Sequence, residues 1–177
     1  GTFGALTAGT IDISGSANAG PPVTLNDTLT FNGLVNSTVA ATTIDTAATV
    51  NVNAGITAAT TLDINDATTV NAATGNTIQT TSGELDIQTN VGTLNITGAD
   101  ATLLTIDGNG DAAVLLAAVT DTANPNLTVN SEGAVNIVSV AMGTGTLTVN
   151  VDNDADGTAT GTFGALTAGT IDISGSA

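Results

Sequence analysis

Hydrophobic and polar residues alternate along most of the chain in short stretches. Examples are TVNVN at 49–53, TLDIN at 61–65 and TLTVNV at 146–151. Alternation of Leu, Ile or Val with Thr, Asp or Asn has a period of two residues, which is typical of a half-buried β-strand. The β-branched Thr on the polar side favours a strand further. Many of these stretches begin roughly 8–12 residues apart, so the pattern predicts an all-β protein.

One stretch departs from this alternation. Residues 112–119 form a run of eight apolar residues between Asp111 and Asp121. The run is compatible with a short helix capped by Asp111 and equally with a strand buried on both faces. It is far shorter than the ~20 apolar residues of a membrane-spanning helix, so we expect no membrane insertion.

A long segment of the chain occurs twice. The sequence GTFGALTAGTIDISGSA at 1–17 returns without a change at 161–177. Identity of this length predicts a repeat array, with residues 1–160 as one β-rich unit and 161–177 as the start of the next identical unit. The segment before the second copy, 152–160, is short and acidic rather than a long Gly/Ser linker, so we expect successive units to be tightly coupled.

Two architectures fit these strands. In a β-solenoid, turns of roughly 20–24 residues wind around small aliphatic side chains, and about seven turns advance ~34 Å per unit. In the alternative, tandem antiparallel β-sandwich modules, LTVN-SEG-AVNI reads as a hairpin with Gly133 at a left-handed position. A sandwich core usually contains Trp or Tyr, and this chain has neither. The sequence therefore favours the solenoid.

Composition excludes several classes of function. The chain has 16 Asp and Glu residues but no Lys, Arg or His, which gives a formal charge of −16. Nucleic acids and anionic membrane surfaces are therefore not expected as partners. Without His or Cys, nucleophilic triads and His/Cys zinc sites are impossible. No Trp or Tyr is available to hold a sugar next to paired carboxylates. We expect no catalytic residue and no enzyme.

A candidate calcium loop lies just before the second copy of the repeated segment. Asp152, Asp154, Asp156 and Gly157 match the spacing D-x-D-x-D-G, in which alternate carboxylates converge on one hard cation and the Gly allows a sharp turn. The position of the bidentate Glu in an EF-hand is occupied by a Phe, so the loop does not match a full EF-hand. One interpretation is a shorter calcium loop, completed by a backbone carbonyl such as that of Thr158 and by water or another carboxylate. The alternative interpretation is a plain acidic turn.

A weaker loop of the same kind occurs earlier in the chain. Asp107, Asn109 and Asp111 offer oxygen ligands at the same alternation, but the closing Gly is missing. The alternative is a tight turn.

Four sequons of the form N-x-S/T are present, at Asn26, Asn36, Asn95 and Asn126. A chain this rich in Ser, Thr and Asn contains about this many by chance. They are candidate sites for attached glycans only where they are exposed.

Strands such as TLTVN and TLDIN, separated by Asn/Asp/Gly turns within long identical units, resemble the repeat regions of giant bacterial or archaeal surface fibres and adhesins. The resemblance implies an extracellular stalk, fibre or sheath protein, which in the adhesins is often calcium-loaded. This chain differs from typical adhesin modules because it has no basic residue, so no binding specificity is transferred. The absence of a Met or a basic leader at Gly1 suggests a mature fragment of a larger precursor.

The sequence thus predicts a structural protein whose main partner is itself. Repeats stack end to end in an extracellular filament, because an open sheet edge offers unpaired N–H and C=O groups to the next unit. Two alternatives are a ligand-binding adhesin stalk module and a phage or virus fibre shaft made of three chains.

Overall fold

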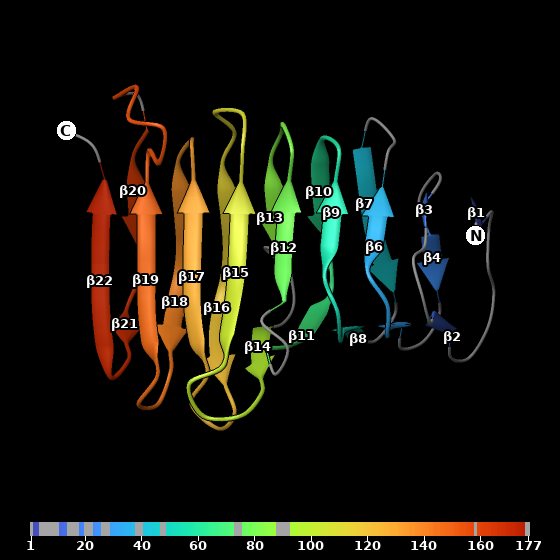
Figure 1. Ribbon diagram of the computed structural model, residues 1–177, viewed down its shortest axis with the longest axis horizontal. Coiled ribbons are helices and arrows are strands. Elements are labelled where there is room, and N and C mark those ends of the chain that lie inside the picture. Colours follow the sequence, from blue (N-terminus) through green and yellow to red (C-terminus); the bar gives the residue numbers. More distant parts are fainter. Residues whose placement is uncertain are drawn as a thin grey trace.

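A computed structural model of the chain describes residues 2–3, 11–13, 18–19, 23–25, 29–37, 41–46, 49–72, 76–87, 93–157 and 159–175; side chains are described from residue 29 onward, except 45–46. All regular structure in these residues is β-strand, and every strand pairing is parallel. The strands stack turn upon turn, with β1 and β22 at opposite ends (Figure 1). The fold is a β-solenoid, as the sequence predicts.

The solenoid has three faces. Face I is a seven-stranded sheet of β6 (Val35–Ser37), β9 (Ile56–Ala58), β12 (Thr77–Thr80), β15 (Leu103–Gly108), β17 (Asn126–Ser131), β19 (Thr146–Val151) and β22 (Thr170–Gly175). Face II contains β4 (Val23–Leu25), β7 (Ala41–Thr46), β10 (Thr61–Ile64), β13 (Leu85–Ile87) and β20 (Gly161–Phe163). Face III contains β2 (Ile11–Ile13), β5 (Leu29–Phe31), β8 (Thr49–Val52), β11 (Ala67–Asn71), β14 (Thr93–Thr97) and β21 (Leu166–Thr167). The short strands β1 (Thr2–Phe3) and β3 (Asn18–Ala19) pair with each other.

Two long strands, β16 (Val114–Asp121) and β18 (Val135–Ala141), bend around the corner between faces II and III. The first half of β16 pairs with β13 and the second half with β14. At the bend, Leu116 and Ala117 are both buried, which interrupts the alternation. From Val114 onward the apolar run at 112–119 is therefore a strand that follows two walls of the core, and the run contains no helix. No helix in the described part of the chain is long and apolar enough to cross a membrane.

Turns of the solenoid differ in length because the corners that connect their strands contain different numbers of residues. On face I, Leu127 pairs with Leu147 in one of the shortest turns, whereas Ile78 pairs with Ile106 across a clearly longer one. The turn from Ile78 to Ile106 is also longer than the sequence predicts. The strands nevertheless keep their register, because extra residues are placed in the corners and not in the sheets.

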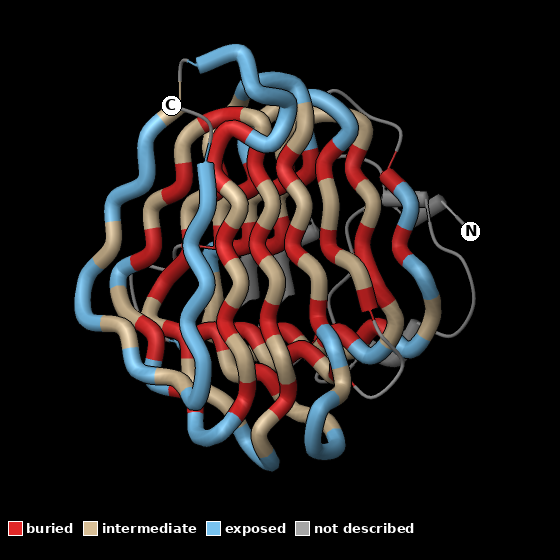
Figure 2. Tube along the Cα trace, turned by 60° about the vertical axis from the view of Figure 1, so that its left-hand side comes forward, coloured by how far each residue is buried: buried red, intermediate tan, exposed pale blue. Residues whose placement is uncertain are grey.

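The core is made of continuous columns of aliphatic side chains. On face I, one column is Val35, Ile56, Ile78, Ile106, Val129, Val149 and Ile173. The members from Ile56 to Val149 are fully buried, and this alternation of buried and outward residues recurs around the chain (Figure 2). Outward amides form ladders as well: the Ser174 hydroxyl donates to Asn150 Oδ1 (2.6 Å), and Asn150 Nδ2 donates to Asn130 Oδ1 (2.7 Å).

The segment LTVN-SEG-AVNI is not a hairpin. Its strands β17 and β18 lie on different faces and pair with other turns. Gly133 has no left-handed backbone; a Cβ there would lie 2.5 Å from the carbonyl oxygens of Asp111 and Ala112 in the turn below. This Gly is thus required by the close stacking of corners, and the prediction of a left-handed residue was wrong.

The two copies of the repeated segment have different partners. In the second copy, β20 and β21 pair with β18, and β22 pairs with β19. In the first copy, β1 pairs with β3, and β2 pairs with β5 on face III. Identical sequence therefore lies on different faces in the two copies.

Candidate metal centre

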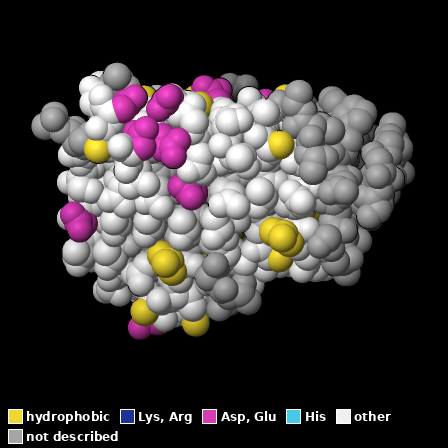
Figure 3. All heavy atoms as spheres, turned by 45° about the horizontal axis from the view of Figure 1, so that its top comes forward, with side chains coloured by type: hydrophobic (Ala, Val, Ile, Leu, Met, Phe, Trp, Pro, Cys, Tyr) yellow, Lys and Arg dark blue, Asp and Glu magenta, His cyan; other side chains and the backbone are white. Residues whose placement is uncertain are grey.

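Carboxylates gather where the chain leaves face I on three successive turns. These corners, 109–113, 132–134 and 152–160, are stacked, since the N–H of Glu132 donates to Gly108 O (3.0 Å) and the N–H of Asn153 donates to Ser131 O (2.8 Å). We call Asp111, Glu132, Asp152, Asp154 and Asp156 the acidic corner. Asp111, Asp154 and Asp156 are exposed, and Figure 3 shows Asp and Glu side chains gathered in a patch on the surface.

Asp152 holds the last loop in shape. Its side chain is 3% exposed, and its Oδ1 and Oδ2 accept the N–H groups of Asp156 (3.2 Å) and Gly157 (2.9 Å). Asp152 (φ 57°), Ala155 (φ 66°) and Gly157 (φ 82°) are left-handed, which curls the loop tightly. The buried carboxylate thus binds the backbone of its own turn.

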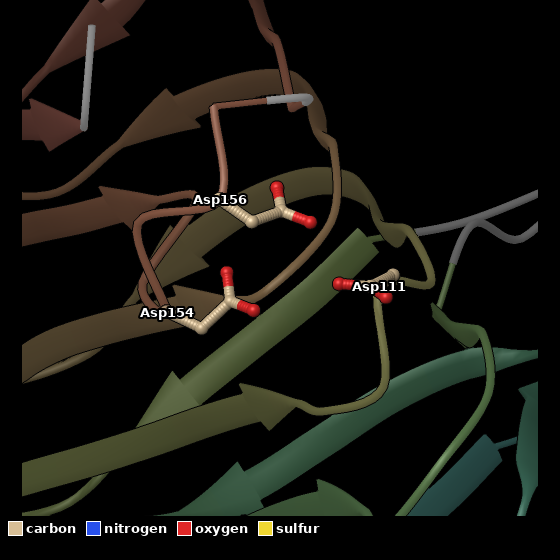
Figure 4. A group of neighbouring side chains, drawn as sticks. All are labelled: Asp111, Asp154 and Asp156. Carbon is tan, nitrogen blue, oxygen red and sulfur yellow. The ribbon is translucent and has the colours of Figure 1, made fainter.

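Three exposed carboxylates meet in front of this loop. The ligand oxygens of Asp111, Asp154 and Asp156 lie within 4.8 Å of one another, and Figure 4 shows Asp154 and Asp156 opposite Asp111 on the neighbouring loop. The corner between them, 132–134, has only three residues between its strands, so the longer corners on either side approach each other across it. The structure thereby joins one residue of the weaker predicted loop to two residues of the stronger one. Thr158, predicted to complete the ligand set, lies outside the described residues.

The other two residues of the weaker loop have different surroundings. Asp107 is the outward residue near the end of β15 and shares a side-chain hydrogen bond with Asn109. Asn109 Nδ2 donates to Thr80 O (2.7 Å) in the turn below. Gly110, left-handed at φ 84°, donates its N–H to the Glu132 carboxylate. This loop is held together by hydrogen bonds between turns.

The charges of the acidic corner repel one another. The Asp156 carboxylate is the main cause that raises the pKa of Asp111 above its ordinary value; burial and the carboxylates of Asp154, Glu132 and Asp152 act in the same direction. The pKa of Asp107 is raised as well, mainly by burial, although its hydrogen bond with Asn109 opposes the change. The chain contains no Lys or Arg, so this repulsion is relieved only by protons or by cations from solution.

Comparisons with known proteins identify no relative. No family model matches the chain, and neither the curated proteins nor the solved structures contain a significant match. Functional inference therefore depends on the geometry alone.

The donor set is that of a hard cation. Three neighbouring carboxylates, in a chain without His or Cys, could hold a hard cation, a class that includes Ca²⁺, Mg²⁺ and Mn²⁺. A pocket beside the acidic corner is lined by Asn150, Val151, Asp152, Asn153, Ala155, Ser174 and Gly175. Its single carboxylate, Asp152, already accepts backbone N–H groups, so the pocket adds no strong ligand to the three exposed acids.

The sequons differ in accessibility. Asn36 is exposed on β6. Asn95 Oδ1 accepts the Thr120 hydroxyl (3.2 Å), and Asn126 Oδ1 accepts the N–H of Thr146 (2.8 Å), so both amides belong to ladders between turns. Asn26 lies outside the described residues.

Proposed function

We propose that the chain is one repeat of an extracellular structural filament, in which identical β-solenoid units follow one another without a break. The observation that supports this most directly is the place of the second copy of the repeated segment, whose strands β20, β21 and β22 continue the stack on β18 and β19. Ile171 and Ile173 on β22 are 42% and 44% exposed, although they continue columns whose preceding members, Leu147 and Val149, are fully buried. Such an apolar end next to an unpaired sheet edge is stable when another turn covers it.

The repeat supplies that turn. A chain in which the unit 1–160 recurs provides further strands of the same kind after β22. From Ile13 to its copy Ile173, such a unit corresponds to about seven turns and an advance of ~34 Å. The absence of Lys and Arg also leaves no peptide bond for trypsin-type proteases, which suits a fibre outside the cell.

A bound cation at the acidic corner is part of the proposal. The corner 152–160 connects β19 to the second copy of the repeated segment, so Ca²⁺ held by Asp111, Asp154 and Asp156 would stabilise the junction between units. It would also cancel the repulsion that raises the pKa of Asp111.

A chain of two units tests the structural role. Residues 1–160 followed by residues 1–177 should form one straight rod, whose maximum dimension in small-angle X-ray scattering exceeds that of the single chain by ~34 Å. Negative-stain microscopy should show uniform rods. Two beads joined by a flexible segment would contradict the proposal and favour an adhesin stalk module.

The cation is tested separately. The melting temperature should rise when millimolar Ca²⁺ replaces a chelator, and Asp154→Ala should remove most of that rise. Asp100→Asn is the matched control, because it removes an exposed carboxylate from a different corner. A rise that is equal in both variants would indicate general charge screening and no site.

A further inference from the structure

The chain contains two Asn-Gly dipeptides, Asn32-Gly33 and Asn109-Gly110. In such a dipeptide the backbone nitrogen of the Gly can attack the side-chain carbonyl carbon of the Asn, because Gly has no Cβ that hinders the approach. The cyclic imide that forms releases ammonia, and water then opens it to Asp or isoaspartate. The surroundings of each dipeptide in the folded protein decide how fast it reacts.

At Asn109-Gly110 a carboxylate lies next to the attacking nitrogen. The N–H of Gly110 donates to the side chain of Glu132, which belongs to the corner of the next turn. The backbone of Glu132 is fixed as well, since its N–H donates to Gly108 O (3.0 Å). A general base must be within hydrogen-bond reach of the proton that it removes, and Glu132 meets this condition.

The amide that would be attacked is held in place. Asn109 Nδ2 donates to Thr80 O (2.7 Å) in the turn below, and the side chain shares a hydrogen bond with Asp107. The backbone carbonyl of Asn109 accepts the N–H of Gly83 (3.1 Å). The fold thus orients the amide before the reaction, whereas in the unfolded chain the side chain samples several rotamers.

The corner also requires a Gly after Asn109. Gly110 is left-handed at φ 84°, and a Cβ there would lie 2.9 Å from the Cα of Ser82 in the turn below. Gly110 is exposed, and Asn109 and Glu132 are half-buried, so water has access to the site. Close stacking of the corners therefore keeps the residue type that leaves Asn109 most open to attack.

We propose that Asn109 is a site of self-catalysed deamidation, with Glu132 as the general base. Glu132 takes the proton of the Gly110 N–H while this nitrogen forms a bond to Asn109 Cγ. The bond between Cγ and Nδ2 then breaks, and Nδ2 leaves with that proton as ammonia. Water opens the imide at either carbonyl carbon, so the reaction needs no reactant besides water. It does not depend on the proposed filament.

The product has a different charge and different contacts. Either way of opening the imide leaves a carboxylate at position 109, so acids then occupy alternate positions 107, 109 and 111, as they do at 152, 154 and 156. A carboxylate cannot donate to Thr80 O, so the corner loses a hydrogen bond to the turn below. The reaction thus adds negative charge next to the acidic corner and loosens the stacking of the loop that carries it.

Incubation of the full chain in heavy-oxygen water measures the reaction. Each deamidated peptide gains a heavy oxygen atom from the water, and mass spectrometry after digestion with pepsin separates the peptide of Asn109 from that of Asn32. In the folded protein Asn109 should react at least about tenfold faster than in the same chain unfolded in urea. In urea the two dipeptides should react at similar rates, because neither has folded surroundings.

A pair of Glu→Gln variants tests the base. Glu132→Gln keeps the size of the side chain and an oxygen that accepts the Gly110 N–H, but it cannot take up the proton. It should slow the reaction of Asn109 in the folded protein at least about tenfold and leave that of Asn32 unchanged. Glu84→Gln is the matched control, because it makes the same change at an exposed residue of the corner below. Circular dichroism checks that both variants are folded.

Two results would overturn the proposal. If folded Asn109 reacts no faster than Asn109 in urea, the corner protects the amide instead of activating it; this comparison needs no variant. If folded Glu132→Gln reacts as fast as the unchanged chain, or Glu84→Gln slows the reaction equally, Glu132 is not the base.

Discussion

A cavity in the middle of a core column should destabilise the solenoid far more than the same truncation at its end. Ile106 is fully buried on β15 between Ile78 and Val129. Ile173 is a member of the same column on the terminal strand, where it is 44% exposed. The two residues therefore provide a matched pair of Ile→Ala substitutions that differ mainly in burial.

The expected magnitudes follow from that difference. Ile106→Ala removes fully buried methyl and methylene groups in a column whose backbone is held on both sides, and should cost about 2–5 kcal/mol. Ile173→Ala loses only part of the transfer free energy and leaves a gap that is open to solvent, so about 1 kcal/mol is expected. With an m value of about 2 kcal/mol per M urea, the midpoints should fall by about 1–2.5 M and about 0.5 M respectively.

Urea unfolding followed by circular dichroism measures both values, since the chain has no Trp or Tyr for intrinsic fluorescence. Turns of a solenoid contact only their neighbours, so Ile106→Ala should also broaden the transition as the two halves uncouple. Equal shifts for the two variants would refute the reasoning, because the column would then not be a continuous core with an open end.

Three further predictions concern the corners. Asp152→Ala in the presence of a chelator should lower the free energy of unfolding by about 1–3 kcal/mol, because two backbone N–H groups lose their acceptor. Asp154→Ala under the same conditions should change the free energy of unfolding little. Equal losses in the two variants would contradict the distinction between a turn residue and a metal ligand. The raised pKa of Asp111 means that the folded state holds this proton more tightly than the unfolded chain. The melting temperature should therefore rise as the pH falls through the raised pKa toward the ordinary 3.8, and a profile that Asp111→Asn does not flatten would count against this repulsion. Gly133→Ala should cost about 1–3 kcal/mol in thermal or urea unfolding, because its Cβ meets backbone of the turn below; a neutral result would show that the corners are not tightly stacked.

Much of the fold could be predicted from the chain. Two-residue alternation in segments such as 61–65 and 146–151 identifies the strands, and small aliphatic side chains favour a solenoid. The lengths of the corners were harder to predict from the sequence, because corners of three and of nine residues both connect neighbouring faces. For the same reason, the short corner at 132–134 resembles a hairpin loop when only local sequence is considered.

The candidate site was only partly predictable. The D-x-D-x-D-G spacing identifies the loop, but it assigns Asp152 and Asp154 the same role as metal ligands. In the structure Asp152 is buried and binds backbone N–H groups, whereas Asp154 is exposed beside the other carboxylates. That Asp111 joins them depends on which corners stack, which is a property of turn lengths and not of any local motif. A search for acids that recur about one or two turns apart would have brought these residues together.

The orientation of the backbone bonds determines how the solenoid responds to pulling. The ladders between turns run along the long axis, and β1 and β22 lie at opposite ends (Figure 1), so a force applied there peels turns away one after another. Each detached turn of roughly 20–28 residues contributes about 65–100 Å of extended chain in place of ~4.8 Å of stacked height. Under tension the solenoid would lengthen manyfold in discrete steps, while the turns that remain stacked keep their register.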